Sequence, residues 1–250
     1  MLTLYPRADD AGSSQAANRA IRECVACGII KNVSLMAPPA AIEHAAEVLK
    51  DLDTTDVCFG VHVTLNAEWE GIKWGPITSP EEVPSLVDDQ GYFLADPKGY
   101  VGRISVTEAL REAKAQLDKL RALGFKLSYL DEHMGVGVNW VPELHQALVE
   151  LARQENLYHA DVIEPLPAIE LSGDVFANFK RRIGEYPEGE LIYYTHPAFA
   201  DPELEPCYNA DVPKGKISRE RDAERRLLCN PETKAWLAKS NVRLKRFSEL

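Results

Sequence analysis

Apolar residues recur along this chain with two periods, one typical of strands and one typical of helices. In residues 57–65, apolar side chains occupy most positions, which is typical of a strand buried on both faces of a parallel sheet. In residues 107–123, apolar side chains lie three or four positions apart and Gly124 follows, which predicts a helix with one buried face. The two patterns alternate through most of the chain.

This alternation predicts an α/β fold with a mainly parallel sheet. The expected strands comprise residues 2–8, 32–36, 57–65, 126–130, 158–163 and 190–195. The expected helices comprise residues 14–26, 40–49, 107–123, 141–156, 219–229 and 231–239, the first with Ser13 or Ser14 as its N-cap. At 250 residues, such a sheet either closes as a barrel or stays open. The glycine-rich phosphate-binding motifs G-x-G-x-x-G and G-x-x-x-x-G-K-[ST] do not occur, which disfavours a nucleotide-binding sheet.

One long segment, residues 66–104, interrupts the alternation. It is rich in proline and glycine and carries Trp69, Trp74 and Tyr92, so it is too long for a bare connection and too aromatic for a linker. Two interpretations stay open: a packed excursion that caps one end of a barrel, or a loop that binds substrate. We therefore expect residues 1–250 to form a single domain with a long inserted loop, 66–104.

The overall charge narrows the range of partners. The chain has 28 Lys and Arg against 39 Asp and Glu, a formal net charge of −11, and no basic stripe. Nucleic acid and an anionic membrane surface are therefore not expected partners, and a neutral or cationic small substrate fits better. No apolar run is long enough for a spanning helix, and the early charges at Arg7 and Asp9 do not fit a signal peptide. Monomer and homodimer both stay open.

Five cysteines are scattered along the chain, an odd number that does not suit a disulfide scaffold. Cys24 and Cys27 have the C-x-x-C spacing of redox and zinc sites. However, they lie in the apolar stripe of an expected helix and no second C-x-x-C occurs, so we interpret them as buried small hydrophobic residues. Reduced thiols indicate a cytoplasmic protein.

Asp and His residues repeatedly follow the expected strands. Asp9 and Asp10 end the first strand, His62 lies in the third, Asp131 and His133 follow the strand 126–130, and His196 follows the strand 190–195. Because the carboxyl ends of parallel strands meet at one edge of the sheet, we expect these side chains to gather there.

Each of these residues also has a structural interpretation. The aspartate pair could cap the following helix, although a serine already serves as the N-cap. His62 taken alone fits a satisfied core residue. His196 fits a third nitrogen ligand, a general acid or a structural side chain. His44 and His145 in helices, and His159 at the start of a strand, are expected to be structural.

Taken together, His62, His133 and one N-terminal aspartate offer two nitrogen ligands and one oxygen ligand. Such a set leaves coordination positions open for water, as catalytic zinc sites require, and it also suits non-haem Fe(II). We expect the carboxylates of Asp131 and Glu132 to support the imidazole of His133.

Several motifs resemble those of one family, the YdjC-like carbohydrate deacetylases of the ChbG/HpnK group. Residues 8–12 resemble its A-D-D-x-G opening, and residues 60–65 are similar to its G-x-H-x-T-L. Residues 131–133 match its D-x-H, and residues 196–197 match its late H-P. The matches run in order from Ala8 to His196.

The resemblance implies a modified (β/α) barrel related to polysaccharide deacetylase and glycoside hydrolase barrels. It implies one divalent metal ion, magnesium or zinc, held by Asp10, His62 and His133. By analogy with NodB-type deacetylases, Asp9 is the general base and His196 the candidate general acid. Two imidazole ligands favour zinc on grounds of ligand softness.

The expected activity is therefore metal-dependent removal of an acetyl group from an N-acetylated sugar. Residues 134–137 depart from the family, whose better-known members have further histidines there, so chito-oligosaccharide specificity is not carried over. Two alternatives remain: another metal-dependent hydrolase, for example of phosphoesters, or a non-catalytic sugar-binding protein on the same fold.

Overall fold

All seven strands of the computed structural model, which describes residues 1–250, belong to one sheet. The order is β5-β4-β3-β2-β1-β6, with β7 against β1, and every pairing is parallel. The strands are β1 (Leu2–Ala11), β2 (Asn32–Leu35), β3 (Cys58–Val63), β4 (Leu127–Glu132), β5 (Tyr158–His159), β6 (Gly189–Thr195) and β7 (Val242–Leu244). The parallel sheet predicted from the alternating pattern is confirmed.

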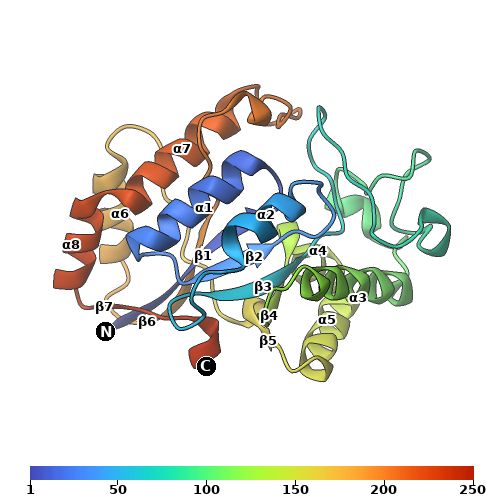
Figure 1. The fold of residues 1–250 in the computed structure, drawn as a ribbon, viewed down its shortest axis with the longest axis horizontal. Helices are drawn as coiled ribbons and strands as arrows, with labels where there is room; N and C mark the ends of the chain where they lie inside the picture. The colour runs from blue at the N-terminus through green and yellow to red at the C-terminus, as the bar shows by residue number, and fades with distance from the viewer.

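Eight helices surround this sheet (Figure 1). They are α1 (Gln15–Cys27), α2 (Ile42–Leu49), α3 (Val106–Ala122), α4 (Val136–Trp140), α5 (Pro142–Gln154), α6 (Val175–Gly184), α7 (Lys216–Cys229) and α8 (Pro231–Lys239). Figure 1 shows α1, α6, α7 and α8 gathered on the side of β1 and β6, and α3, α4 and α5 on the side of β4 and β5. The sheet therefore lies between two groups of helices.

A short bridge brings the two edges of the sheet together. Ile192 in β6 donates its backbone N–H to Glu164 O at 2.9 Å and accepts from Leu166 N at 2.7 Å. The segment 164–166 follows β5 by only a few residues, so the sheet curls back on itself. The expected α/β fold with a modified barrel is thus confirmed, with closure by one irregular segment rather than by a regular strand pair.

The ends of the first helix follow the expected capping chemistry. Ser14 is the N-cap of α1, and its Oγ accepts a hydrogen bond from Ala17 N at 3.0 Å. Gly28 follows the helix with φ 88°, a left-handed conformation that glycine adopts without steric cost. Ser14 fixes where α1 begins, just after the aspartate pair, and Gly28 fixes where it ends.

Some elements differ from the prediction. The expected strand 158–163 is strand only at Tyr158–His159, and a 3-10 turn follows at Ala160–Val162. The turn carries Asp161 inward, where its carboxylate accepts a hydrogen bond from Glu132 N at 2.9 Å. Helices α4 and α6 and strand β7 were not predicted.

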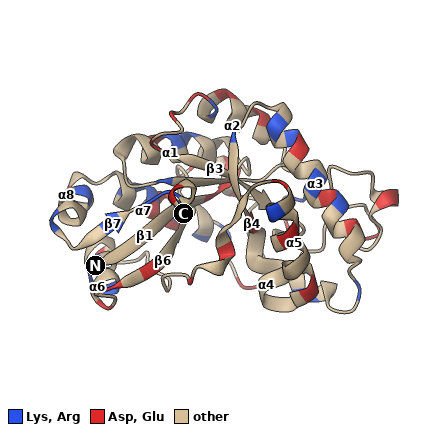
Figure 2. Cartoon of the chain, turned by 90° about the horizontal axis from the view of Figure 1, so that it is seen from below, with Lys and Arg blue, Asp and Glu red and all other residues tan.

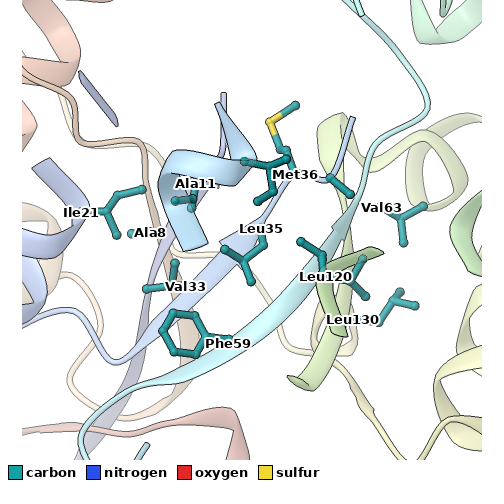
Figure 3. Packing of buried hydrophobic residues seen from close by; sticks show 14 of the residues in the cluster. Ala8, Ala11, Ile21, Val33, Leu35, Met36, Phe59, Val63, Leu120 and Leu130 are labelled. Carbon is teal, nitrogen blue, oxygen red and sulfur yellow. The ribbon is translucent and has the colours of Figure 1, made fainter. Parts of the chain in front are cut away.

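The core packs between the sheet and the helices. Figure 3 shows Val33 and Leu35 of β2, Phe59 of β3 and Leu120 of α3 in one buried cluster. Fully burying one such side chain stabilises the fold by roughly 1.5–3 kcal/mol. This packing holds the strands in the register that aligns their carboxyl ends.

The segment 66–104 packs its buried apolar side chains into the main hydrophobic core of the protein. The buried Tyr100 hydroxyl lies within hydrogen-bond distance of the carbonyl oxygens of Leu65 and Leu86, and it donates its one proton to either. The carboxylate of Glu112, on α3, accepts from the backbone N–H groups of Ile77 and Thr78, each at 2.9 Å. The segment is therefore a packed excursion fastened to α3, at the side of the molecule where Figure 1 shows it.

Basic and acidic side chains are interspersed over the surface helices. On α3, Lys and Arg alternate with Asp and Glu along the helix (Figure 2). The exposed pair Lys114–Asp118 is one example. None of the helices combines the length and the hydropathy that crossing a bilayer requires.

Candidate functional site

Three of the predicted residues meet at the carboxyl edge of the sheet. The ligand atoms of Asp10, His62 and His133 all lie within 4.8 Å of one another, and all three residues are buried. His62 Nε2 lies 3.2 Å from His133 Nδ1. Asp10 Oδ1 lies 3.4 Å from His133 Nδ1 and 3.7 Å from His62 Nε2. One oxygen and two nitrogens thus face a common point.

The backbone at Asp10 turns its carboxylate toward this point. Asp10 has φ 62°, a left-handed conformation that is uncommon for a residue other than glycine, and the pairing of β1 with β2 shifts register between Ala8 and Ala11. Asp10 Oδ2 pairs with Arg221 Nη2 at 2.5 Å. Asp10 Oδ1 is buried without any hydrogen-bond partner. An unpartnered carboxylate oxygen facing two imidazole nitrogens fits a bound cation.

In both His62 and His133, the ring nitrogen that does not face the common point lies beside a carboxylate. His62 Nδ1 lies 3.1 Å from Asp131 Oδ1, and His133 Nε2 lies 3.1 Å from Glu68 Oε2. Carboxylates in this position orient metal-ligating histidines and increase their basicity. The prediction that Asp131 and Glu132 support His133 is wrong: Asp131 supports His62, and Glu132 bonds to His145 instead. Glu68 was missed, because a glutamate in the loop gives no sequence signal for this contact.

The charges of the three residues are strongly coupled. Burial lowers the pKa of His133, but Glu68 and Asp10 outweigh it and raise that pKa to about 10. Burial raises the pKa of Asp10, but Arg221 and His133 outweigh it and hold that pKa well below its ordinary value. Without a metal ion, His133 is therefore protonated beside an ionised Asp10. A cation that binds here must displace that proton.

Asp9 points to a different partner from Asp10. Both of its carboxylate oxygens accept from Arg7, Oδ1 from Nε at 2.5 Å and Oδ2 from Nη2 at 2.8 Å. Arg7 also pairs with Asp131, and with Asp161 at 3.3 Å. One buried guanidinium thus connects Asp9 to the carboxylate that holds His62. Arg7 and Asp161 were missed by the sequence analysis, since each lies in a predicted strand.

His196 follows β6 at the same edge of the sheet. Its backbone N–H donates to the carboxylate of Glu224 on α7, and its ring reaches solvent. Desolvation by the surrounding protein lowers the pKa of His196, while Asp10 and Asp9 act to raise it. His196 is therefore neutral near pH 7 and can accept a proton before it donates one.

A small pocket opens beside Asp10. One wall comes from the segment 66–104 and the other from α7 and the residues before it. Its lining comprises Asp10, Ser13, Ser14, Met36, Glu68, Trp69, Ile72, Trp74, Glu203, Leu204, Cys207 and Arg221. Trp74 is fixed in this wall by its indole N–H, which donates to Asn66 O at 2.8 Å. Tyr92 is not among the lining residues and its side chain is exposed.

Comparison with known proteins gives a consistent result over the whole chain. Residues 4–172 match the family described as YdjC-like protein. A carbohydrate deacetylase of Thermoanaerobacter pseudethanolicus is 26% identical over 265 residues, covering 100% of both chains. A carbohydrate deacetylase of Geobacillus stearothermophilus is 29% identical over 254 residues, covering 97% of this chain and 95% of its own.

One solved structure shares the fold closely. It is that of an Enterococcus faecalis protein described as a candidate cellobiose-phosphate cleavage protein. Its TM-score is 0.79 at 21% identity, and the match covers 99% of this chain and 98% of that one. The likeness therefore extends over the complete barrel, including the segment 66–104.

Proposed function

The chain belongs to the YdjC-like family, and on that basis we propose that it is a metal-dependent carbohydrate N-deacetylase. The reaction is hydrolysis of the acetamide of an N-acetylated sugar or oligosaccharide. The carbohydrate deacetylases that match over the full chain support this reaction. The observation that carries the proposal is the meeting of Asp10, His62 and His133 beside the pocket, with Asp10 Oδ1 unpartnered.

Asp10, His62 and His133 are the proposed metal ligands. A bound divalent ion supplies Lewis-acid polarisation of the acetyl carbonyl and acidifies the attacking water. Two imidazoles and one carboxylate suit Zn²⁺ better than Mg²⁺, which prefers oxygen ligands. The carboxylates of Asp131 and Glu68 hold the two imidazoles in the required orientation.

Asp9 is the proposed general base and His196 the proposed general acid. Asp9 takes a proton from the attacking water while the oxygen of that water forms a bond with the acetyl carbon. Arg7 fixes both carboxylate oxygens of Asp9 and so positions the base. His196 must first take up a proton, and it then gives this proton to the sugar nitrogen as the C–N bond breaks, which leaves acetate and a free amine.

The segment 66–104 is proposed to set the accepted substrate length, as an inserted loop of a single domain spanning residues 1–250. Trp69 and Trp74 line the pocket, where an indole face suits stacking on a sugar ring. Glu68 belongs to the same segment and contacts His133. Substrate contacts and support for the metal ligand thus come from one stretch of chain.

The test is acetate release from N-acetylglucosamine and its oligomers. We expect release from the purified protein, loss after chelation, and recovery when Zn²⁺ or Mg²⁺ is added back. The Asp9→Asn variant is the matched control for acetate from contaminating enzymes. Phosphate release from sugar phosphates without acetate release supports the phosphoesterase alternative, and sugar binding without turnover supports the non-catalytic alternative.

A further inference from the structure

A second cluster of metal-binding side chains lies outside the proposed catalytic site. It consists of Glu132 at the end of β4, His145 on α5 and His159 in β5. One ligand atom from each residue lies within 4.8 Å of the other two. His145 Nδ1 is 2.7 Å from Glu132 Oε1, and His159 Nε2 is 4.0 Å from the same oxygen. The two imidazole rings have centroids 5.0 Å apart.

The cluster is separate from the first site although both use β4. Successive side chains of a strand point to opposite faces of the sheet. Asp131 points to the face where His62 and Ser34 contact it. Glu132 points to the other face, toward α4 and α5, where Gly137 N donates to its Oε2 at 2.5 Å.

His159 has polar atoms without any partner. The side chain is only 4% exposed. Both of its ring nitrogens are buried and neither makes a hydrogen bond. A buried imidazole normally has a partner, because an unsatisfied polar group costs roughly 1–3 kcal/mol. Nε2 faces Glu132 Oε1 at a distance too long for a hydrogen bond but suitable for two ligands of one ion.

The spacing of the three residues suits a tetrahedral cation. Zn²⁺ bonds to nitrogen and oxygen are about 2.0–2.1 Å long, so neighbouring ligand atoms lie about 3.3 Å apart. The observed distances of 2.7 and 4.0 Å bracket that value, so small rotations of the side chains suffice. The side chain of His145 is 26% exposed, which gives an ion a path from solvent.

The backbone of Gly137 lies in close contact with the carboxylate of Glu132. A Cβ at Gly137 would lie 2.6 Å from Glu132 Oε2 and 2.7 Å from His145 N, so only glycine fits there. The Gly137 N–H therefore reaches Glu132 Oε2 and holds the carboxylate in one orientation. Oε1 is left directed at the two histidines.

We propose that Glu132, His145 and His159 form a second binding site for a divalent transition-metal ion, with Zn²⁺ as the best fit. Two imidazoles and one carboxylate are its ligands, and a water molecule completes the coordination. An ion here links β4, β5 and α5 directly behind the strand that carries Asp131. The proposal is independent of deacetylation, since it rests on residues that take no part in the proposed reaction.

The test measures the number of metal ions bound per chain in variants that each lack one ligand of one site. The probes are Zn²⁺ and Co²⁺ alone, with bound metal measured after dialysis. We expect two ions per chain in the unaltered protein and one in His62→Gln. We expect one in His145→Gln, whose amide can still donate to Glu132. The control His44→Gln changes a histidine that is a ligand in neither metal site, and it keeps two ions.

A second readout covers variants that fold poorly. In the His62→Gln background, Zn²⁺ should raise the melting temperature, and adding His145→Gln or His159→Phe should abolish that rise. The Co²⁺ spectrum should lack a thiolate charge-transfer band, which rules out the cysteines as ligands. The proposal is overturned if His62→Gln binds no ion, or if His145→Gln and His159→Phe both bind as many ions as the unaltered protein.

Discussion

At the scale of single residues, the two adjacent aspartates are separated by their partners. Asp9 bonds to Arg7 through both oxygens, whereas Asp10 gives one oxygen to Arg221 and leaves the other unpartnered. The left-handed backbone at Asp10 makes this divergence possible. Two identical carboxyl groups one position apart are thereby suited to different chemistry.

Substitution by asparagine distinguishes the two roles, because it keeps the shape and removes the charge. Asp9→Asn should retain metal and lose roughly 10²–10⁴ in rate, the usual contribution of a general base. Asp10→Asn should bind metal more weakly, with activity partly restored by excess metal. Metal content and acetate release are measured on the same samples. If Asp9→Asn loses the metal and Asp10→Asn keeps it, the two assignments are reversed.

Metal binding at Asp10, His62 and His133 should depend on pH. Because the pKa of His133 is raised to about 10, this imidazole is protonated at pH 6–8 and must release its proton to bind a metal ion. Metal affinity should therefore rise by about tenfold per pH unit over this range. Titration calorimetry in buffers of different ionisation enthalpy measures the released proton. A metal affinity that does not change between pH 6 and 8 would contradict the raised pKa of His133.

At the scale of elements, the expected strands and helices were placed correctly where periodicity was strong. Asp10, His62 and His133 could be predicted as neighbours because each follows or ends a parallel strand. Glu68 and Asp161 could not, since their contacts depend on how a loop and a 3-10 turn fold back onto the sheet. Helix α6 was not predicted, although apolar residues recur four positions apart at Val175, Phe179 and Ile183.

Helix α3 should be a major source of stability through its buried face. Leu120 is fully buried against the sheet, so Leu120→Ala should reduce the free energy of unfolding by roughly 2–5 kcal/mol. Lys114→Ala on the exposed face of the same helix should change it by less than about 1 kcal/mol. Denaturant unfolding of both variants measures the difference. Similar values for the two would mean that α3 packs loosely.

The contact between α7 and the end of β6 should make stability depend on pH. Burial raises the pKa of Glu224 to about 7, while the His196 N–H and Arg221 act to lower it. The folded protein therefore holds a proton that the unfolded chain releases above about pH 4.5. This contribution is full below pH 4.5 and is lost as the pH rises through 7, by about 3 kcal/mol at most.

The variant Glu224→Gln isolates this effect, because glutamine still accepts the His196 N–H but does not ionise. Relative to Glu224→Gln, the unaltered protein should lose stability between pH 4.5 and 7. Denaturant unfolding at several pH values gives the two curves. Parallel curves would show that Glu224 ionises normally in the folded protein.

At the scale of the whole molecule, the segment 66–104 and α7 face each other across the pocket. Trp69 and Trp74 come from the first and Arg221 from the second, so residues far apart in the sequence line one space. The segment also carries Glu68, which contacts His133. Substrate size and the geometry of the proposed metal ligands are thus coupled through one packed excursion.

Removing an indole from the pocket should affect long substrates most. Trp69→Ala should raise KM more for N-acetylated oligomers than for the monosaccharide, since a longer chain has more rings to stack. Tyr92→Ala is the matched control, because Tyr92 belongs to the same segment but does not line the pocket. Steady-state kinetics on a length series measures the effect. Equal changes for all lengths would indicate that Trp69 serves only in packing.

The position of β1 within the sheet has a consequence for how the protein is made. β1 leaves the ribosome long before two of its partners, β6 at residues 189–195 and β7 at residues 242–244. The strand that carries both aspartates therefore has one side unpaired until residues 189–195 and 242–244 have been synthesised. Its apolar sequence has to be shielded during that interval, by α1, by β2 or by a chaperone. A chain that is truncated before residue 189 would thus contain β1 without its partners β6 and β7.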